Sequence, residues 1–266
     1  MRIRATVAAV TGALALSAFA VPTAQAAAAA APDVTFTKVT VNNGKPIVAR
    51  AAGTTSVPVT YTFKHAAGLD IGSDNLLTGP ALYVGASLTV DNVRLIGDEP
   101  GTCTATSSTT ASCKGFIDLH PGSEGTLRNT DARTWKVGAI AITGDEDGVK
   151  IQSGLGTTQI KFHSKLNTDA TPEPVRKGAT ITVKGTLTRA NWNTSKYGGY
   201  VGAPVALQFK KAGATTFTTV KTVKTGAAGA LKTTVKASVD GTYRFAFAGS
   251  TTTAPITAVG DVIDVK

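Results

Sequence analysis

Apolar and polar residues alternate along most of this chain with a period of two. In the segment 203–210, APVALQFK, the side chains of Val205, Leu207 and Phe209 fall on one face. Successive side chains of a strand point to opposite faces, so this pattern predicts half-buried antiparallel strands. The same alternation predicts further strands at 179–187, 230–238, 242–249 and 261–266.

One run in the second half departs from the alternation. Within 216–225, Phe217, Val220 and Val223 recur at every third residue, a spacing that a β-bulge would explain. A further strand from Leu166 to Ala170 ends at the prolines of TPEP, as edge strands often do. Seven short strands in about a hundred residues favour an immunoglobulin-like β-sandwich.

The first half is less regular but similar in kind. We expect a second β-sandwich at 32–163, followed by the sandwich at 164–266. The two should pack end to end, because no long Gly/Ser linker separates them. The fold class is therefore all-β, with two tandem immunoglobulin-like sandwiches. The strands expected in the first half are 33–41, 57–63, 86–95, 114–119, 134–143 and 157–162.

The chain opens with a basic start, an apolar stretch and the small residues Ala24 and Ala26. This pattern is typical of an export signal, and we expect residues 1–26 to be cleaved. The apolar stretch is shorter than the roughly 20 residues that span a bilayer. We therefore expect a secreted, extracellular protein without membrane insertion. No cysteine adjoins the signal, so association with the cell wall would be non-covalent.

Cys103 and Cys113 are the two cysteines of the chain, and small polar residues separate them. In an exported protein such a pair predicts a disulfide. The alternatives are two free thiols, or a metal site that would need further ligands.

The charge is distributed unevenly. Residues 27–163 hold 11 basic against 12 acidic residues, a net charge of −1, whereas residues 164–266 hold 14 against 5, a net charge of +9. This asymmetry permits binding of an anionic cell-envelope polymer or glycan, although lysines also keep strand edges from pairing. We expect no nucleic acid partner. Alternation directs Lys210 and Arg244 outward from one sheet, and Lys232 and Lys236 from the other.

Motifs for catalysis and metal binding are weak. The chain has no G-x-S-x-G elbow, no H-E-x-x-H and no phosphate-binding glycine loop, so we expect no enzyme and no cofactor. Asp145, Glu146 and Asp147 are candidate calcium ligands beside Gly148. Because Gly154 falls where an EF-hand needs a bidentate Glu, a hairpin turn is the favoured interpretation.

The segments GTLTRANW, YGGYVGAPVALQFKK, TTVKTVKT, DGTYRFAFAG and GDVIDVK together resemble an immunoglobulin-like module of exported proteins from high-GC Gram-positive bacteria. The resemblance covers residues 164–266 closely and extends loosely to Trp135. It implies a non-catalytic accessory or surface module, and some members are described as calcium-binding. Asn191 and Tyr243 stand where that family often has Asp and Trp, which weakens an ion-binding role here.

The loop TRANWNTSKYGGYVG contains three candidate ligand contacts, Trp192, Tyr197 and Tyr200. They would serve either as a stacking platform for sugars or as a plug at one end of the sandwich. The loop offers Asn191 and Asn193 but no acid, so the plug is favoured. The sequence thus predicts an exported, non-catalytic binding or structural protein, with a carbohydrate-binding module as the alternative and an undetected hydrolase as the third possibility.

Overall fold

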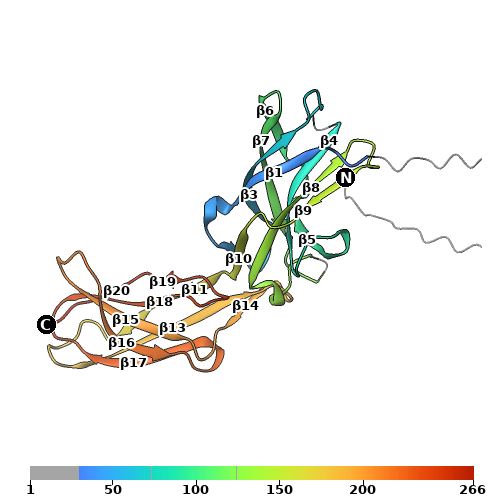
Figure 1. The fold of residues 1–266 in the computed structure, drawn as a ribbon. Helices are drawn as coiled ribbons and strands as arrows, with labels where there is room; N and C mark the ends of the chain where they lie inside the picture. The colour runs from blue at the N-terminus through green and yellow to red at the C-terminus, as the bar shows by residue number, and fades with distance from the viewer. Residues whose placement is uncertain (1–29, 73, 124) are drawn as a thin grey trace, which may run out of the picture.

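The computed structural model describes residues 30–72, 74–123 and 125–266, and the signal segment 1–26 lies outside them. The described chain forms twenty strands and four short 3-10 turns, with no α-helix among those residues. Figure 1 shows the strands gathered into two β-sandwiches, joined at one end at an angle, with the C-terminus at the far end of the second. The predicted all-β fold with two tandem sandwiches is confirmed.

The first sandwich consists of one sheet in the order β1-β3-β7-β6 and another in the order β2-β10-β8-β4-β5, with β9 also paired to β8. These orders correspond to A-B-E-D and A′-G-F-C-C′, the arrangement of an immunoglobulin domain with a C′ strand. Its strands are β1 (Val34–Val41), β2 (Ile47–Ala49), β3 (Thr55–His65), β4 (Leu76–Tyr83), β5 (Val93–Ile96), β6 (Thr102–Ser107), β7 (Thr110–Leu119), β8 (Thr134–Thr143), β9 (Val149–Gln152) and β10 (Thr157–Phe162).

Strand β3 shows why this sequence forms a sandwich. Val57, Val59, Tyr61 and Phe63 alternate with more exposed residues, and all four are buried in the core. Because side chains alternate between faces, only one register buries all four of them. That register is favoured because burying apolar surface contributes roughly 25 cal/mol per Å². Neighbouring β7 pairs with β3 over ten residues in that register.

The first strand changes sheets within the chain segment 42–46. Asn42 and Asn43 have positive φ angles of 49° and 53°, a conformation that asparagine tolerates better than most residues. This turn directs β2 onto the opposite sheet, where it pairs in parallel with β10. The turn at 42–46 thus separates the end of β1 from β10.

Two expectations in the first half need correction. The expected strand 86–95 forms only at its end, because Asn92 caps a 3-10 turn by accepting from the Thr89 amide and donating to the Ser87 carbonyl. Strand β4 is not among the strands expected from the sequence, and it contains Pro80. Strand β5 pairs only with Ala81–Tyr83, so one side of β4 has no partner at Pro80.

The second sandwich packs β11, β12, β13, β14 and β17 against β15, β16, β18, β19 and β20. Strand β13 is central to the first of these sheets, and β15 and β18 pair at the centre of the other. Its strands are β11 (Ser164–Leu166), β12 (Asp169–Thr171), β13 (Thr180–Asn191), β14 (Lys196–Gly199), β15 (Pro204–Lys211), β16 (Thr218–Lys224), β17 (Ala230–Lys236), β18 (Gly241–Phe247), β19 (Ile256–Thr257) and β20 (Asp261–Ile263).

The irregular spacing in β16 does form the predicted bulge. Leu207 lies opposite Lys221 and the next residue, Gln208, lies opposite Thr219, which leaves Val220 without an opposite partner. The strand expected at 166–170 is divided into β11 and β12, which pair with successive parts of β13.

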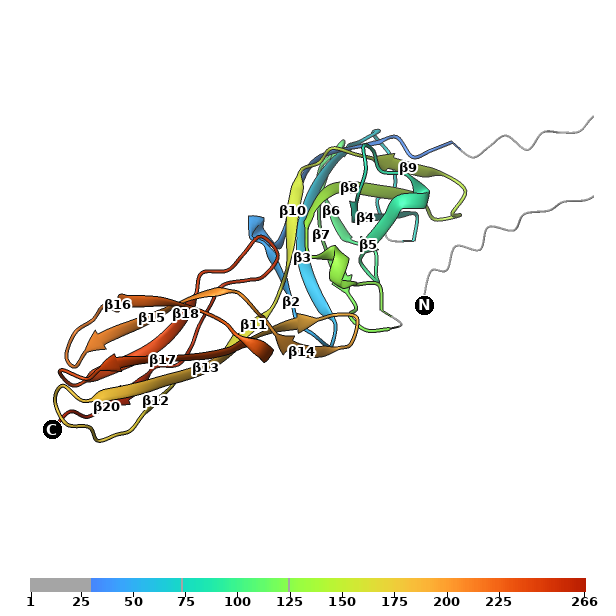
Figure 2. The same ribbon diagram turned by 90° about the horizontal axis from the view of Figure 1, so that it is seen from below.

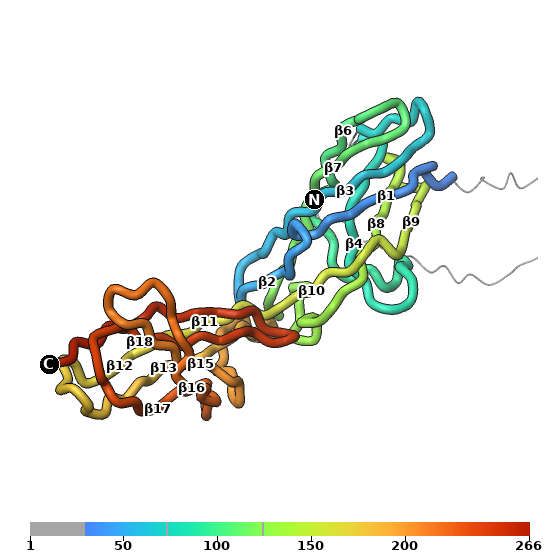
Figure 3. Tube along the Cα trace, turned by 60° about the vertical axis from the view of Figure 1, so that its left-hand side comes forward, coloured from blue at the N-terminus to red at the C-terminus, as the bar shows by residue number. Residues whose placement is uncertain are grey.

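The two sandwiches meet without a linker. Strand β10 ends at Phe162 and β11 begins at Ser164, so His163 alone stands between them. Figures 2 and 3 show β10 running directly into β11 where the molecule narrows, beside β2. The buried core of the first sandwich also includes Ala190 and Trp192, which come from the second half of the chain.

Candidate binding surfaces

Trp192, just after β13, lies at the junction of the two sandwiches. Its side chain is fully buried, with 0% exposed. The indole Nε1 donates to the Ala49 carbonyl at 3.2 Å, and the ring lies 4.3 Å from that of Phe162 between centroids. The ring therefore fills space between the sandwiches and offers no face on which a sugar could stack.

A network of asparagines holds the Trp192 loop in place. Asn129 accepts from the Trp192 amide at 2.8 Å and donates from Nδ2 to Asn191 Oδ1 at 2.9 Å. The Asn129 amide in turn donates to Asn193 Oδ1 at 3.0 Å, and the Gly122 amide donates to the Trp192 carbonyl at 2.7 Å. The side-chain oxygens of Asn191 and Asn193 are thus both occupied by Asn129 of the first sandwich.

The two tyrosines of the loop are also engaged at the junction. Tyr197 Oη lies 3.0 Å from His163 Nδ1, and the Lys165 ammonium lies 3.9 Å above the Tyr197 ring. Tyr200 Oη donates to Ser250 Oγ at 3.4 Å. Burial lowers the pKa of His163, and the nearby positive charges of Arg50 and Lys165 lower it further.

An open hollow of about 390 Å³ lies beside Trp192, and we call it the junction hollow. Its polar side chains come from both sandwiches, with Asn129 on one side and Arg189 and Asn191 on the other. Sequence reasoning missed Arg189, because its partners lie far away in the chain. The remaining lining residues are Ala132, Phe162, Ala190, Gly198, Gly199 and Thr252.

The basic candidates lie on two different sheets. Arg244 on β18 lies opposite Gln208 on β15, and Lys210 lies two residues further along β15. Lys232 and Lys236 lie on β17, which pairs with β13 in the other sheet. Positive charge is thus spread around the second sandwich.

Phe217 brings two of these cations together. The Arg244 guanidinium carbon lies 3.6 Å above the Phe217 ring centroid, and the Lys210 ammonium lies 5.2 Å from it. Gln208 Oε1 accepts from Arg244 Nε at 2.9 Å, which fixes the guanidinium further. A cation over an aromatic face is stabilised by the ring quadrupole, so this outer face holds two positive charges in an ordered position.

Asp145, Glu146 and Asp147 lie in the turn between β8 and β9, which pair as an antiparallel hairpin. Asp145 accepts hydrogen bonds from the Thr143 hydroxyl and the Asp147 amide, and these bonds lower its pKa. In the described part of the chain, no three His, Cys, Asp or Glu side chains gather as a metal site.

Cys103 and Cys113 form the predicted disulfide. They lie directly opposite each other on β6 and β7, with a Cα–Cα distance of 4.1 Å. Cys113 is buried in the core of the first sandwich, so the disulfide joins the edge strand β6 to that core.

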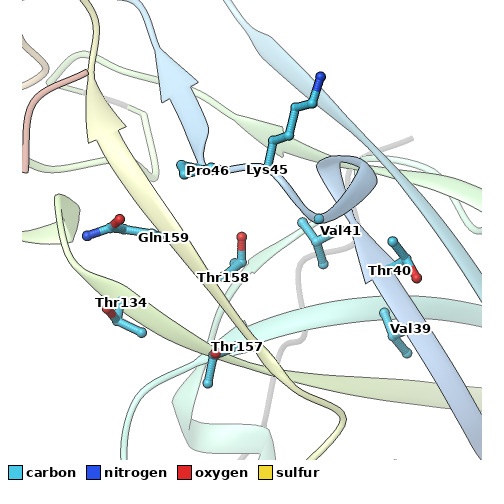
Figure 4. A pocket seen from close by; sticks show the side chains of 10 residues that line it. Val39, Thr40, Val41, Lys45, Pro46, Thr134, Thr157, Thr158 and Gln159 are labelled. Atoms are coloured by element: carbon cyan, nitrogen blue, oxygen red, sulfur yellow. The ribbon is translucent and has the colours of Figure 1, made fainter. Parts of the chain in front are cut away.

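A second open hollow of about 390 Å³ lies on the first sandwich, between the end of β1 and β10. Figure 4 shows its lining side chains, among them Thr134, Thr157, Thr158 and Gln159, with Lys45 extending from the turn before β2. Lys45 is its one charged lining residue, and it has no aromatic side chain. Short hydroxyl groups and one exposed ammonium give little basis for specific recognition.

Thr54, His120 and Asp98 form a hydrogen-bonded cluster that resembles a catalytic triad. His120 Nε2 lies 3.0 Å from Asp98 Oδ1, and its Nδ1 lies 3.2 Å from Thr54 Oγ1. A hydroxyl, an imidazole and a carboxylate in this sequence define a nucleophile, a base and its orienting acid. Thr54 and Asp98 are both exposed, however. Bulk water weakens the electrostatic interactions that would stabilise a charged transition state, so this cluster is a poor candidate for a catalytic site. The cluster joins the loops before β3 and after β5 and β7.

Comparison with known proteins places the chain in no family. No family model and no curated protein matches it. Similar solved structures include the mouse nectin-like molecule 4 ectodomain, at 10% identity and a TM-score of 0.28, matched over 88% of this chain and 65% of that one. The CbhA fibronectin(III)-like modules of Clostridium thermocellum are 11% identical, with a TM-score of 0.29 and coverage of 85% and 92%. The D00-D0 domain of intimin is 12% identical, with a TM-score of 0.27 and coverage of 85% and 98%.

At these scores the likeness carries no functional argument. The immunoglobulin-like class is instead defined by the strand orders of the two sandwiches. Among the described residues, no helix is long and apolar enough to cross a membrane.

Proposed function

We propose that this protein is an exported, non-catalytic binding protein that acts at the cell surface or in the medium. Its second sandwich binds an anionic polymer of the cell envelope, and its first sandwich is held at a defined angle to that surface. The observation that carries this proposal is the net charge of +9 on residues 164–266, against −1 on residues 27–163.

The positive charge of the second sandwich is largely free of internal partners. Between its described acidic and basic side chains there is a single ion pair, Lys266 with Asp264 at 3.8 Å. The other cations of the second sandwich have no acidic partner among the described residues, and an extended polyanion can neutralise several of them at a time. Such attraction is screened over about 10 Å at 0.1 M salt, so binding should weaken steeply as salt is added.

The disulfide and the sandwich architecture support action outside the cell. A disulfide between Cys103 and Cys113 persists in oxidising compartments and is rare in the cytosol. The junction supports a presenting role, because loop-to-core packing and paired hydrogen bonds hold the sandwiches in one orientation.

The carbohydrate-binding alternative is not supported in its original form. It requires Trp192 as an exposed stacking surface, and that ring is buried between the sandwiches.

The test uses the full chain and isolated cell envelope. We expect retention in 20 mM salt and release in 500 mM salt. A variant in which Lys210, Lys232, Lys236 and Arg244 are changed together to Gln should be retained at least tenfold less. Retention that is unchanged by salt, or by the four substitutions, would refute the proposal.

The matched control removes the same number of positive charges from the first sandwich. Lys38, Lys45, Lys64 and Lys114 are all exposed there. Changing these four to Gln should leave retention near that of the parent protein. If both variants lose retention equally, overall charge and not the second sandwich is responsible.

A further inference from the structure

The junction hollow contains an arginine without an acidic partner. Arg189 places its guanidinium carbon 4.3 Å from the Tyr200 ring centroid and 4.9 Å from that of Phe162. Its Nη1 donates to Thr253 Oγ1 at 3.3 Å. No described carboxylate forms an ion pair with it, so the other N–H groups of the guanidinium remain available for a ligand.

The two rings hold Arg189 in position before any ligand arrives. A guanidinium that lies over aromatic faces retains its in-plane donors, because stacking uses the faces of the group and not its edge. Its planar pair of N–H groups matches the two oxygens of a carboxylate, and such bidentate pairs are among the stronger hydrogen-bonded contacts in proteins.

Asn191 adds a second donor with a fixed orientation. Its Oδ1 accepts from Asn129 Nδ2 at 2.9 Å and from the Asn193 amide at 3.2 Å. The oxygen is therefore occupied, and the Nδ2 group, which has no hydrogen-bond partner among the described residues, is left as a donor. Thr252 lines the same hollow.

We propose that the junction hollow binds a saccharide unit that carries a carboxylate. Arg189 pairs with the carboxylate, and Asn191 and Thr252 bind neighbouring ring hydroxyls. The volume of about 390 Å³ is near the lower end for small-molecule sites, and such sites occur preferentially between domains. A cationic or fully apolar ligand would displace water from the Arg189 donors without offering them an acceptor, which is unfavourable.

This site is separate from the surface proposed to bind the envelope polymer. Arg189 lies at the junction, whereas Lys210, Lys232, Lys236 and Arg244 lie along the body of the second sandwich. Failure of one proposal therefore leaves the other standing, and the two are measured with different ligands.

The test is a calorimetric titration of the full chain with three probes. We expect glucuronic acid to bind at least tenfold more tightly than glucose, which has the hydroxyls but no carboxylate. We also expect it to bind more tightly than N-acetyl-alanyl-alanine, which has a carboxylate but no sugar ring. Equal binding of glucose would overturn the role of the carboxylate, and equal binding of the dipeptide would overturn the assignment to saccharides.

Two variants locate the binding. Arg189→Gln removes the cation and should weaken glucuronic acid binding at least tenfold. Gly198→Val fills the hollow without changing charge: Gly198 lies directly opposite Arg189, on the same sheet face, and a Cβ there meets nothing within 4 Å. The second variant keeps the test decisive if loss of Arg189 impairs folding.

The matched control is Lys64→Gln, which removes one exposed positive charge from strand β3 of the first sandwich. It should bind glucuronic acid as the parent protein does. Undetectable binding to the parent protein, or unchanged binding in the folded Gly198→Val variant, would overturn the proposal.

Discussion

The rings of Phe162 and Trp192 lie 4.3 Å apart between centroids, and through them the last strand of the first sandwich packs against a loop of the second. The Ala49 carbonyl accepts from the Trp192 indole at 3.2 Å and from the His163 amide at 3.0 Å. A single carbonyl of β2 thereby binds both the connecting residue and the loop. The angle between the sandwiches is determined by buried contacts and not by a flexible linker.

Loss of the Trp192 side chain should destabilise the protein substantially. Trp192→Ala removes a fully buried ring, and truncations of this kind cost about 3–5 kcal/mol. Denaturant unfolding should show this loss in the transition of the first sandwich, because the ring belongs to its core. Trp192→Phe, which keeps the ring contact but loses the bond to Ala49, should cost less. A loss below about 1 kcal/mol for the Ala variant would contradict this assignment of Trp192 to the core.

Reduction of the disulfide should lower stability by a moderate amount. The closed loop spans a sequence separation of 10, for which chain entropy gives about 2–3 kcal/mol. Thermal unfolding of a Cys103→Ser, Cys113→Ser variant should show a lower melting temperature for the first sandwich. Thiol titration of the purified parent protein should find no free thiols. Two free thiols per chain would show that the disulfide does not form in the native protein.

Removal of divalent cations should leave stability nearly unchanged. The carboxylates of the 145–147 turn are exposed, and Asp145 is already hydrogen-bonded to Thr143 and Asp147. A bound structural ion would stabilise the folded state by mass action, so EDTA would lower the melting temperature of a protein that depended on one. We expect a shift within the error of calorimetry. A drop of many degrees would show that the turn binds calcium.

Stability should fall as the solution is acidified through the histidine range. The folded state lowers the pKa of His163 below its ordinary value of about 6.5, so the unfolded chain takes up the proton first. Where the unfolded state binds more protons, stability decreases as the pH falls. The contribution of His163 is therefore constant above about pH 7.5 and declines below about pH 6.5.

The measurement is the melting temperature between pH 8 and pH 5 for the parent protein and for His163→Gln. The variant removes the titrating group and should show a weaker dependence on pH over this range. Equal slopes for the two proteins would show that His163 is as readily protonated in the folded state as in the unfolded chain.

Most of the second sandwich was predictable from the sequence, because its strands alternate regularly. The bulge at Val220 followed from the same reasoning, since a break in the period marks an extra residue. The first half was less predictable. Strand β4 contains Pro80, and the proline fits there because β5 is too short to pair with it. The length of a neighbouring strand cannot be read from the local sequence.

The binding surfaces were less predictable than the strands. The outward positions of Lys210 and Arg244 followed from alternation, but their shared contact with Phe217, which lies between β15 and β16, could not be predicted from any local pattern. Trp192 of the aromatic loop is buried, but the sequence did not identify its packing partner, the core of the first sandwich. Asn129 lies more than sixty residues from the asparagines that it binds, and local patterns carry no information about such pairs.

The position of Trp192 also has a consequence for how such a protein can evolve. Together with Ala190, its indole completes the interior of a sandwich whose other core residues come from an earlier stretch of the chain. Recombination that exchanged the first sandwich alone would leave an unfilled interior in one product and an exposed indole in the other. We therefore expect the two halves to be inherited as a pair, because an exchange of one half must also transfer the Trp192 loop or replace its ring.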